Sequence, residues 1–248
     1  MNYGYATDDP LLGALEEDKV ERYPLQMYRR LVASLPVSLA DQRLLEVGSG
    51  RGGGLAHLAK TQADGGEPLS QAVGGDLCSQ QIALCTKRFA GVAEGLSYVQ
   101  ADAENLPFDD ASFDVVINVE SSHCYPHIDR FLSEVRRVLA PGGCFGIVDF
   151  RKVDDGKMAA FEEKVRPDAA AAAPDAPDAY RCGCSSTRSA GCPCWRTSTS
   201  HLTSSNLASS TTSGGSSSLR ATCTRRCARR SSTSPGSRTA NRASTRTS

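Results

Sequence analysis

An acidic residue and three glycines alternate in the stretch Glu46-x-Gly48-x-Gly50-x-Gly52, directly after an apolar run. Glycine allows a tight turn and lets a ligand approach the main chain. A G-x-G-x-x-G spacing would seat a dinucleotide pyrophosphate on the N-terminus of the next helix. Here the spacing is G-x-G-x-G, and Glu46 would repel a pyrophosphate but not a cationic amino-acid sulfonium. Glycine-rich turns are common, so this turn indicates a ligand only together with other residues.

Two further carboxylates, Asp76 and Asp102, each follow a short strand-like run. Asp76 can accept hydrogen bonds from both hydroxyls of a ribose. Its alternative role is to cap the helix expected near Ser79, but Ser79 serves that role equally well. Asp102 can accept an adenine amino group while Ala103 leaves room for the ring, and its alternative role is a turn carboxylate. The two acids favour a ligand that carries a nucleoside.

One histidine stands where a base would be needed. His123 follows the fourth expected strand, at the carboxyl edge where ligands bind in open α/β sheets. Histidine has an ordinary pKa of about 6.5, which suits a general base at neutral pH. The alternative is a histidine that caps a loop. His57, on the first helix, and His127, at the start of a later helix, are interpreted as structural.

Apolar runs separated by helical patterns must position these residues. Helical spacing follows the glycine turn, recurs after Asp76, and is strongest from Ile128 to Leu139, where Pro141-Gly142-Gly143 is expected to end the helix. Alternating strands and helices at this spacing predict an α/β fold with a doubly wound, mostly parallel sheet. The strands are expected at residues 43–47, 72–76, 96–100, 113–119 and 144–149.

The order of these motifs resembles that of the class I S-adenosylmethionine-dependent methyltransferases. The resemblance rests on L-L-E-V-G-S-G-R-G-G-G, G-G-D-L, D-A-E-N-L-P-F-D-D-A-S-F-D-V-V, E-V-R-R-V-L-A-P-G-G and I-V-D-F, and covers residues 41–151. The run N-V-E-S-S-H-C-Y-P-H, with N-Y-G-Y near the start, is similar to the actinobacterial phthiotriol/phenolphthiotriol dimycocerosate methyltransferases and to related glycolipid and sugar O-methyltransferases. It implies a Rossmann-like fold and S-adenosyl-L-methionine as cofactor.

The resemblance also implies a reaction, the O-methylation of a hydroxyl on a lipid, sugar or polyketide acceptor. Related sugar O-methyltransferases place a histidine at the position of His123 and an acid at the end of the fifth strand, which implies catalytic roles for His123 and Asp149. By matching position, the residues implied to line the cofactor are Glu46, Gly48, Gly50, Gly52, Asp76, Leu77, Asp102, Ala103 and Asn118. Two alternatives stay open: a C-methyltransferase of the quinone or sterol type, which shares D-A-E-N-L-P-F, and an inactive remnant.

The segment before the sheet, residues 1–40, is expected to be an N-terminal cap with a helix near Tyr23–Ala33. In such enzymes an N-terminal segment commonly covers the cofactor. Tyr5 can contact the methionine part there, or it can be a surface aromatic residue. The methyltransferase domain itself is expected over residues 41–165.

Net charge and hydrophobicity limit the kinds of partner that the sequence predicts. The formal net charge of the 248 residues is zero, which gives no field for nucleic acid or an anionic membrane. No apolar run approaches the ~20 residues needed to span a bilayer, and the polar N-terminus lacks the pattern of a secretory signal. We therefore expect a cytoplasmic protein without an integral membrane segment. No metal site is expected among the cysteines before residue 150, which read as small buried hydrophobes.

The remaining stretch, residues 166–248, has a different composition. After Tyr180 it contains no Asp, Glu, Lys, Val, Ile, Phe or Met, so it is expected to be disordered and the sheet to lack its last strands. Three explanations compete: a natural linker or basic arm, a metal module around Cys182-Gly-Cys184 and Cys192-Pro-Cys194, or translation of GC-rich DNA in another reading frame. The third is favoured, because the change falls inside a helical pattern (Met158, Phe161, Val165) and the strands expected afterwards are missing. The metal module is disfavoured, because C-x-C pairs lack the usual zinc-ligand spacing.

Overall fold

The computed structural model describes residues 2, 4–5, 21–152, 164, 198–202 and 217–225. Helices α2 (Arg22–Ala33), α3 (Gly53–Asp64), α4 (Ser79–Arg88) and α5 (Ile128–Val138) and the short 3₁₀ helix η1 (Ser122–Cys124) alternate with the strands. The strands are β1 (Arg43–Val47), β2 (Gln71–Asp76), β3 (Leu96–Gln100), β4 (Phe113–Val119), β5 (Leu139–Lys152), β6 (Ser198–Leu202) and β7 (Ser217–Arg225).

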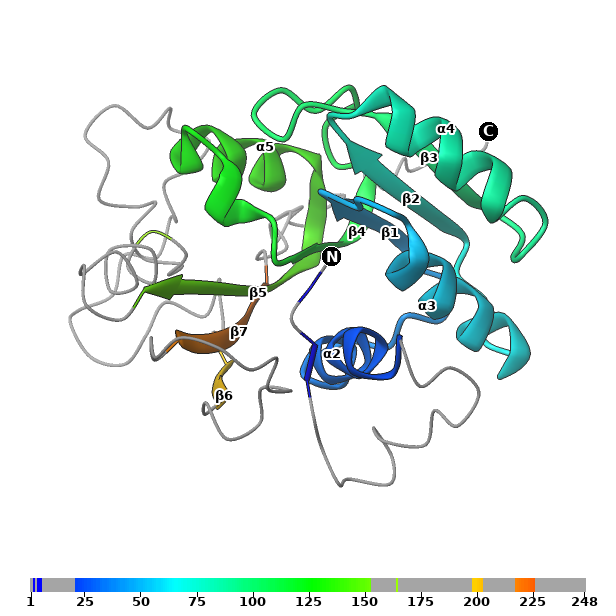
Figure 1. The fold of residues 1–248 in the computed structure, drawn as a ribbon, viewed down its shortest axis with the longest axis horizontal. Coiled ribbons are helices and arrows are strands. Elements are labelled where there is room, and N and C mark those ends of the chain that lie inside the picture. Colours follow the sequence, from blue (N-terminus) through cyan, green and yellow to red (C-terminus); the bar gives the residue numbers. More distant parts are fainter. Residues whose placement is uncertain are drawn as a thin grey trace, which may run out of the picture.

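The strands form one sheet in the order β3-β2-β1-β4-β5-β7-β6 (Figure 1). The first five are parallel, and β7 runs antiparallel to both β5 and β6. The chain winds outward from β1 in one direction to β2 and β3, and in the other direction to β4 and β5. The carboxyl ends of β1 and β4 therefore flank a topological switch point, where ligands bind in open α/β sheets.

Helices cover both faces of the sheet, and each face has its own apolar core. Successive strand residues point to opposite faces, so Leu44 and Leu45, both fully buried, belong to different cores. Leu44 packs in the core under α2, α3 and α4, and Leu45 packs in the core under α5. In Figure 1, α2 and α5 accordingly lie on opposite sides of the sheet. The amphipathic stripe of α5 is buried as its sequence pattern predicts.

The predicted strands at 43–47, 96–100 and 113–119 are confirmed to the residue, and β2 is one residue longer than expected. The end of α5 differs from the prediction. Val138 is its last residue and Leu139 is already extended, so Pro141-Gly142-Gly143 does not form the helix end. The pairing of β4 with β5 jumps from Phe113–Leu139 to Val115–Cys144, because the segment with proline bulges out of the ladder.

The expectation that the sheet lacks its last strands differs from the structure, which places β7 and β6 beyond β5. Strand pairing depends on backbone hydrogen bonds, and β5 offers a long unpaired edge to any extended segment. The low apolar content of these segments was therefore a poor guide to pairing. Of the predicted tail, only 198–202 and 217–225 are described, and the rest lies outside the described residues, as do its close cysteine pairs.

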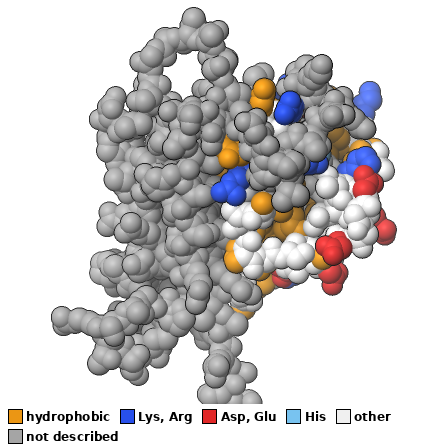
Figure 2. All heavy atoms as spheres, turned by 90° about the horizontal axis from the view of Figure 1, so that it is seen from below, with side chains coloured by type: hydrophobic (Ala, Val, Ile, Leu, Met, Phe, Trp, Pro, Cys, Tyr) orange, Lys and Arg blue, Asp and Glu red, His pale blue; other side chains and the backbone are white. Residues whose placement is uncertain are grey.

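Figure 2 views the molecule from below Figure 1, and basic, acidic and apolar side chains are interspersed on the part of this face that is described. Within the described residues, no helix is both long enough and apolar enough to cross a bilayer.

Candidate functional site

The turn between β1 and α3 has a strained backbone that only glycine adopts readily. Gly48, Gly50 and Gly52 have φ angles of 77°, 52° and 71°, in the left-handed region. A Cβ at Gly48 would overlap the Ser121 hydroxyl and lie 2.7 Å from the Tyr125 hydroxyl, whereas a Cβ at Gly50 would meet nothing within 4 Å. The turn is therefore closely packed at its first glycine and open at its second.

Gly52 is packed differently from the other two glycines. A Cβ there would lie 2.7 Å from the Tyr98 ring and 2.8 Å from the Cys85 sulfur. The Tyr98 hydroxyl also donates to the Gly52 carbonyl over 2.7 Å. Gly52 thus lets α3 pack closely on the sheet and α4, and its predicted place along a cofactor stays a prediction.

The most unusual group in this region is Glu46, which is completely buried in the middle of the sheet. The Tyr28 hydroxyl of α2 donates to its Oε1 over 2.5 Å. Its Oε2 is also buried and has no hydrogen-bond partner among the described residues. Burial raises the pKa of the Glu46 carboxyl to about 8. The free oxygen can accept one more hydrogen bond, most favourably from a cation.

Asp76 stands where β2 ends, beside the glycine turn. Its Oδ2 accepts the Gly50 backbone N–H over 2.8 Å, and its Oδ1 accepts the Cys78 N–H over 2.9 Å. Each carboxylate oxygen has a second lone pair, so both can still accept a hydroxyl. The neighbouring Leu77 is 68% exposed and leaves an apolar surface beside the carboxylate.

Asp102 and Ala103 follow β3 at the same edge of the sheet. Asp102 is exposed, and its Oδ1 accepts the Glu104 N–H over 2.9 Å, as the turn-carboxylate alternative anticipated. Ala103 is buried in the core under α5. The Ala101 N–H donates to the Asp76 carbonyl over 2.9 Å, which ties this loop to the end of β2. The structure therefore brings Asp102 to the same edge as Asp76.

Asn118 lies fully buried near the end of β4 and connects the glycine turn to the next loop. Its Nδ2 donates to the Val47 carbonyl over 2.9 Å, to the Ser121 hydroxyl over 2.8 Å and to the Tyr125 hydroxyl over 3.1 Å. Its Oδ1 is buried without a partner in the described part of the chain. Burial also raises the pKa of Tyr125 to about 12, so this hydroxyl keeps its proton.

His123 and Asp149 meet directly, although 26 residues separate them. The His123 Nδ1 lies 2.8 Å from Asp149 Oδ1, and Asp149 Oδ2 accepts the His123 backbone N–H over 2.9 Å and the Ser122 hydroxyl. The Asp149 side chain is 2% exposed and that of His123 is 28% exposed. The pair combines a buried, fixed carboxylate with an imidazole that solvent or a substrate can reach.

The two histidines interpreted as structural are hydrogen-bonded to residues other than Asp149. His57 accepts a hydrogen bond from Arg29 over 3.3 Å, and burial lowers its pKa to about 4. His127 contacts Glu104 through both its backbone N–H and its Nδ1, at 2.7 and 2.8 Å. It therefore joins the loop before α5 to the loop that carries Asp102.

Helix α2 contacts Glu46 through Tyr28, whereas the predicted contact of Tyr5 with the methionine part of a cofactor stays a prediction. The Tyr5 N–H donates to the Tyr23 carbonyl over 2.9 Å, and its side chain packs partly buried against the core under α2. Tyr28 was missed from the sequence, as were Ser121 and Tyr125. Their roles depend on partners elsewhere in the fold. The quoted run around His123 was a signal for Ser121 and Tyr125, and Tyr28 had no such signal.

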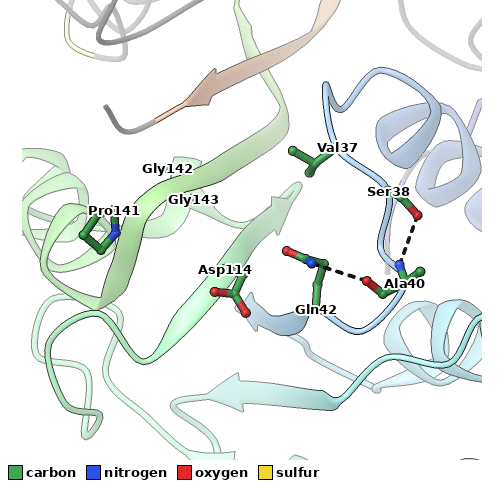
Figure 3. Close-up of a pocket in the computed structure, with 8 residues that line it drawn as sticks. All are labelled: Val37, Ser38, Ala40, Gln42, Asp114, Pro141, Gly142 and Gly143. Atoms are coloured by element: carbon green, nitrogen blue, oxygen red, sulfur yellow. Dashed lines mark hydrogen bonds between the residues drawn. The ribbon is translucent and has the colours of Figure 1, made fainter. Parts of the chain in front are cut away.

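A hollow of about 570 Å³ lies at the opposite, amino edge of the sheet (Figure 3). It is lined by Val37, Ser38, Ala40, Gln42, Asp114, Pro141, Gly142 and Gly143. The charge in its wall, Asp114, is held by the Arg43 guanidinium at 2.8 and 2.9 Å. No set of three potential metal ligands gathers anywhere in the described residues. The hollow therefore lacks the chemistry found at the carboxyl edge.

The matching family model and the similar curated proteins are both of methyltransferases. Residues 45–147 match the family model described as Methyltransferase domain. The chain is 45% identical over 163 residues to the phthiotriol/phenolphthiotriol dimycocerosates methyltransferase of Mycobacterium tuberculosis, covering 65% of this chain and 56% of the relative. It is 46% identical over 152 residues to a fatty-acid O-methyltransferase of Mycolicibacterium smegmatis, covering 61% and 52%. The chain thus spans about half the length of these relatives.

Solved structures give the same fold. The geranyl diphosphate C-methyltransferase from Streptomyces coelicolor A3(2) superposes with a TM-score of 0.60 over 91% of each chain, at 17% identity. The [4+2]-cyclase SpnF superposes with a TM-score of 0.52 over 63% of this chain and 53% of its own, at 23% identity. At these identities only the fold is shared, and the predicted Rossmann-like, doubly wound sheet is confirmed.

Proposed function

Because residues 45–147 match a methyltransferase family model, we propose that this chain binds S-adenosyl-L-methionine and methylates a hydroxyl on a lipid-type acceptor. The observation that carries the proposal is the buried, half-partnered carboxyl of Glu46 beside a left-handed glycine turn. When bound, the cofactor supplies an electrophilic methyl group on a positively charged sulfur.

The residues at the carboxyl edge suit each part of such a cofactor. Glu46 Oε2 can accept the ammonium of its amino-acid part, and Asp76 can accept the ribose hydroxyls beside the exposed Leu77. Asp102 and Ala103 are available for the adenine. Gly50, where the turn is open, leaves room for a ligand to approach the main chain. The fit is supported by buried oxygen atoms that have no partner within the described chain.

The second part of the proposal concerns His123 and Asp149. An ionised carboxylate only accepts hydrogen bonds, so Asp149 holds the proton of His123 on Nδ1 and leaves Nε2 as a proton acceptor. His123 can then take the proton of an acceptor hydroxyl as that oxygen is methylated. Asp149 acts on the reaction through His123 by fixing its ring and stabilising the imidazolium. Methyl transfer itself is an in-line displacement that depends mainly on positioning.

The acceptor class rests on the relatives, which include a fatty-acid O-methyltransferase. A carboxylate acceptor needs no base, because it is already ionised at neutral pH. The His123–Asp149 pair therefore favours a hydroxyl over a carboxylate. Analysis of the product would separate an O-methyl ether from a methyl on carbon. A cytoplasmic location belongs to the same proposal, and cell fractionation tests it.

The experiment is a calorimetric titration of S-adenosylhomocysteine into the full chain, its Asp76→Ala variant and a matched Asp64→Ala control on the exposed end of α3. We expect the wild type and the control to bind alike and Asp76→Ala to bind at least about 100-fold more weakly, since two hydrogen bonds to a charged group are lost. A folded wild type that does not bind would refute the cofactor assignment and favour the inactive remnant. Binding unchanged by Asp76→Ala would refute the proposed role of Asp76.

A further inference from the structure

Tyr28 connects the cap helix α2 to the buried carboxyl of Glu46. Its side chain is 7% exposed, and its ring occupies the space that a side chain at Gly54 would need. The pKa of Tyr28 is raised well above its usual range, first by burial and then by the charge of Glu46. Tyr28 therefore stays protonated and acts only as a donor, which fixes Oε1 and leaves Oε2 as the acceptor that remains.

Within the described part of the chain, the titratable groups that face Glu46 offer it no positive charge. Tyr28 faces it from α2, Asp76 from β2, Tyr98 from β3 and Cys85 from α4. Two of these neighbours are already engaged elsewhere, because the Tyr98 hydroxyl donates to the Gly52 carbonyl and the Cys85 thiol to the Gly50 carbonyl. A buried carboxylate among acids and neutral hydroxyls is costly, so the neutral acid is the less costly form.

We propose that Glu46 holds a proton in the cofactor-free protein and releases it when the cationic cofactor binds, with Tyr28 as the residue that positions the carboxyl for this exchange. The inference rests on the proposed function, because it requires that Glu46 faces the ammonium of the cofactor. On binding, one proton leaves Glu46 for solvent, and the ammonium of the cofactor takes its place beside the carboxylate.

Because the pKa of Glu46 is raised to about 8, binding of the cofactor depends on pH. A bound cation stabilises the carboxylate and lowers that pKa. Below pH 8 the protein must therefore give up a proton in order to bind, so the affinity weakens as the pH falls, by up to about tenfold per pH unit. Above pH 8 Glu46 is already ionised, and this contribution to the pH dependence disappears.

The test is calorimetry with S-adenosylhomocysteine at pH 7 in two buffers whose ionisation enthalpies differ, which gives the number of protons released. The wild type should release close to one proton per ligand bound. Glu46→Gln carries no such proton, so it should bind more weakly, release none and show a flat affinity between pH 6 and 7.5. This variant also separates Glu46 from any other group that could release a proton.

Tyr28→Phe tests the positioning role, with Tyr23→Phe on the same helix as the matched control. The hydrogen bond from Tyr28 lowers the pKa of Glu46, so its removal should shift the pH dependence upward and weaken binding at pH 7 by about five- to tenfold. Tyr23→Phe should behave as the wild type. If Tyr28→Phe does not fold, Glu46→Gln still decides the proton release.

The possible outcomes distinguish the proposed function from the proposed proton release by Glu46. Ligand binding without proton release from the wild type would overturn this inference and leave the proposed function intact. Proton release that survives in Glu46→Gln would assign it to another group and overturn the inference as well. Unchanged affinity and pH dependence in Tyr28→Phe would overturn the positioning role. If the folded wild type does not bind the ligand, the proposed function fails, and this inference fails with it.

Discussion

The two edges of the parallel sheet differ in how their polar groups are partnered. At the amino edge, Asp114 accepts from the Arg43 backbone and from two nitrogens of its guanidinium, beside a hollow of about 570 Å³. At the carboxyl edge, Glu46 and Asn118 each keep a buried oxygen without a partner among the described residues. The hollow is thus lined by a charge that is paired, whereas the unpartnered oxygens of Glu46 and Asn118 lie near the topological switch point. The chemistry of the walls, rather than the size of the space, distinguishes the site.

The difference has an energetic meaning. A buried polar atom without a partner costs about 1–3 kcal/mol, so the carboxyl edge lowers the stability of the cofactor-free protein. The paired charges of the amino edge contribute to stability instead. We therefore expect substitutions at the carboxyl edge to change binding or catalysis, and substitutions at the amino edge to change stability alone.

The largest expected effect belongs to the His123–Asp149 pair. Asp149→Asn should lower kcat for a hydroxylated lipid on the order of 10²- to 10³-fold, because the amide cannot hold His123 in the required tautomer. The affinity for S-adenosylhomocysteine, measured by calorimetry, should stay unchanged. His127→Asn is the control and should retain full turnover.

A comparison of two methyl acceptors gives a second test of the base. Activity on a free fatty acid should be far less sensitive to Asp149→Asn, since a carboxylate acceptor needs no base. Equal losses with hydroxyl and carboxylate acceptors would argue against a base at His123.

A smaller effect is expected when the glycine turn is filled. Gly48→Ala combines a left-handed backbone with overlap against Ser121 and Tyr125, so it should destabilise the protein by about 2–4 kcal/mol and weaken S-adenosylhomocysteine binding. Gly50→Ala is a matched control that has the strained backbone but open space around it, and it should cost only about 1 kcal/mol. Urea unfolding and calorimetry would measure both. Equal destabilisation of the two variants would show that contact at Gly48 is unimportant.

The smallest effect is expected at the amino edge. Arg43 lowers the pKa of Asp114, chiefly through its side-chain hydrogen bonds, so the pair stabilises the fold above the ordinary aspartate pKa of about 3.9. This contribution is lost as the pH falls through the lowered pKa. Asp114→Asn should therefore cost about 1 kcal/mol in urea unfolding at pH 7 and progressively less below about pH 4.

The matched control for the amino edge is Asp110→Asn, which removes an exposed acid beside Arg137 and should change little. S-adenosylhomocysteine should bind both variants as it binds the wild type. Weaker binding by Asp114→Asn would contradict the division of roles between the two edges.

Much of this arrangement was predictable from the sequence because it depends on local patterns. The glycine spacing predicted the turn after β1, and the apolar runs predicted five parallel strands. The position of His123 after β4 and of Asp149 at the end of I-V-D placed both at one edge, and the structure brings them within 2.8 Å. Chain order alone is enough for this, since parallel strands present their carboxyl ends together.

The contacts that sequence reasoning missed have partners far away in the chain. Tyr28 reads as one more apolar position of an amphipathic helix, and only the fold shows that its hydroxyl reaches Glu46. Tyr125 likewise lies in a polar run without helical or strand periodicity, yet it packs against Asn118 and the space next to Gly48. The strands β6 and β7 were missed because they pair through their backbones and carry few apolar residues.

The placement of β5 between β4 and β7 has a consequence for local opening of the protein. Strands with neighbours on both sides are among the last to exchange their amide hydrogens, whereas a single 3₁₀ turn opens readily. Asp149 belongs to such a strand, and His123 belongs to the one turn of η1. Local opening of that turn would separate the His123 imidazole from the Asp149 carboxylate while β5 stays paired and its amide hydrogens stay protected. We therefore expect the proposed base to move more often than the carboxylate that holds it.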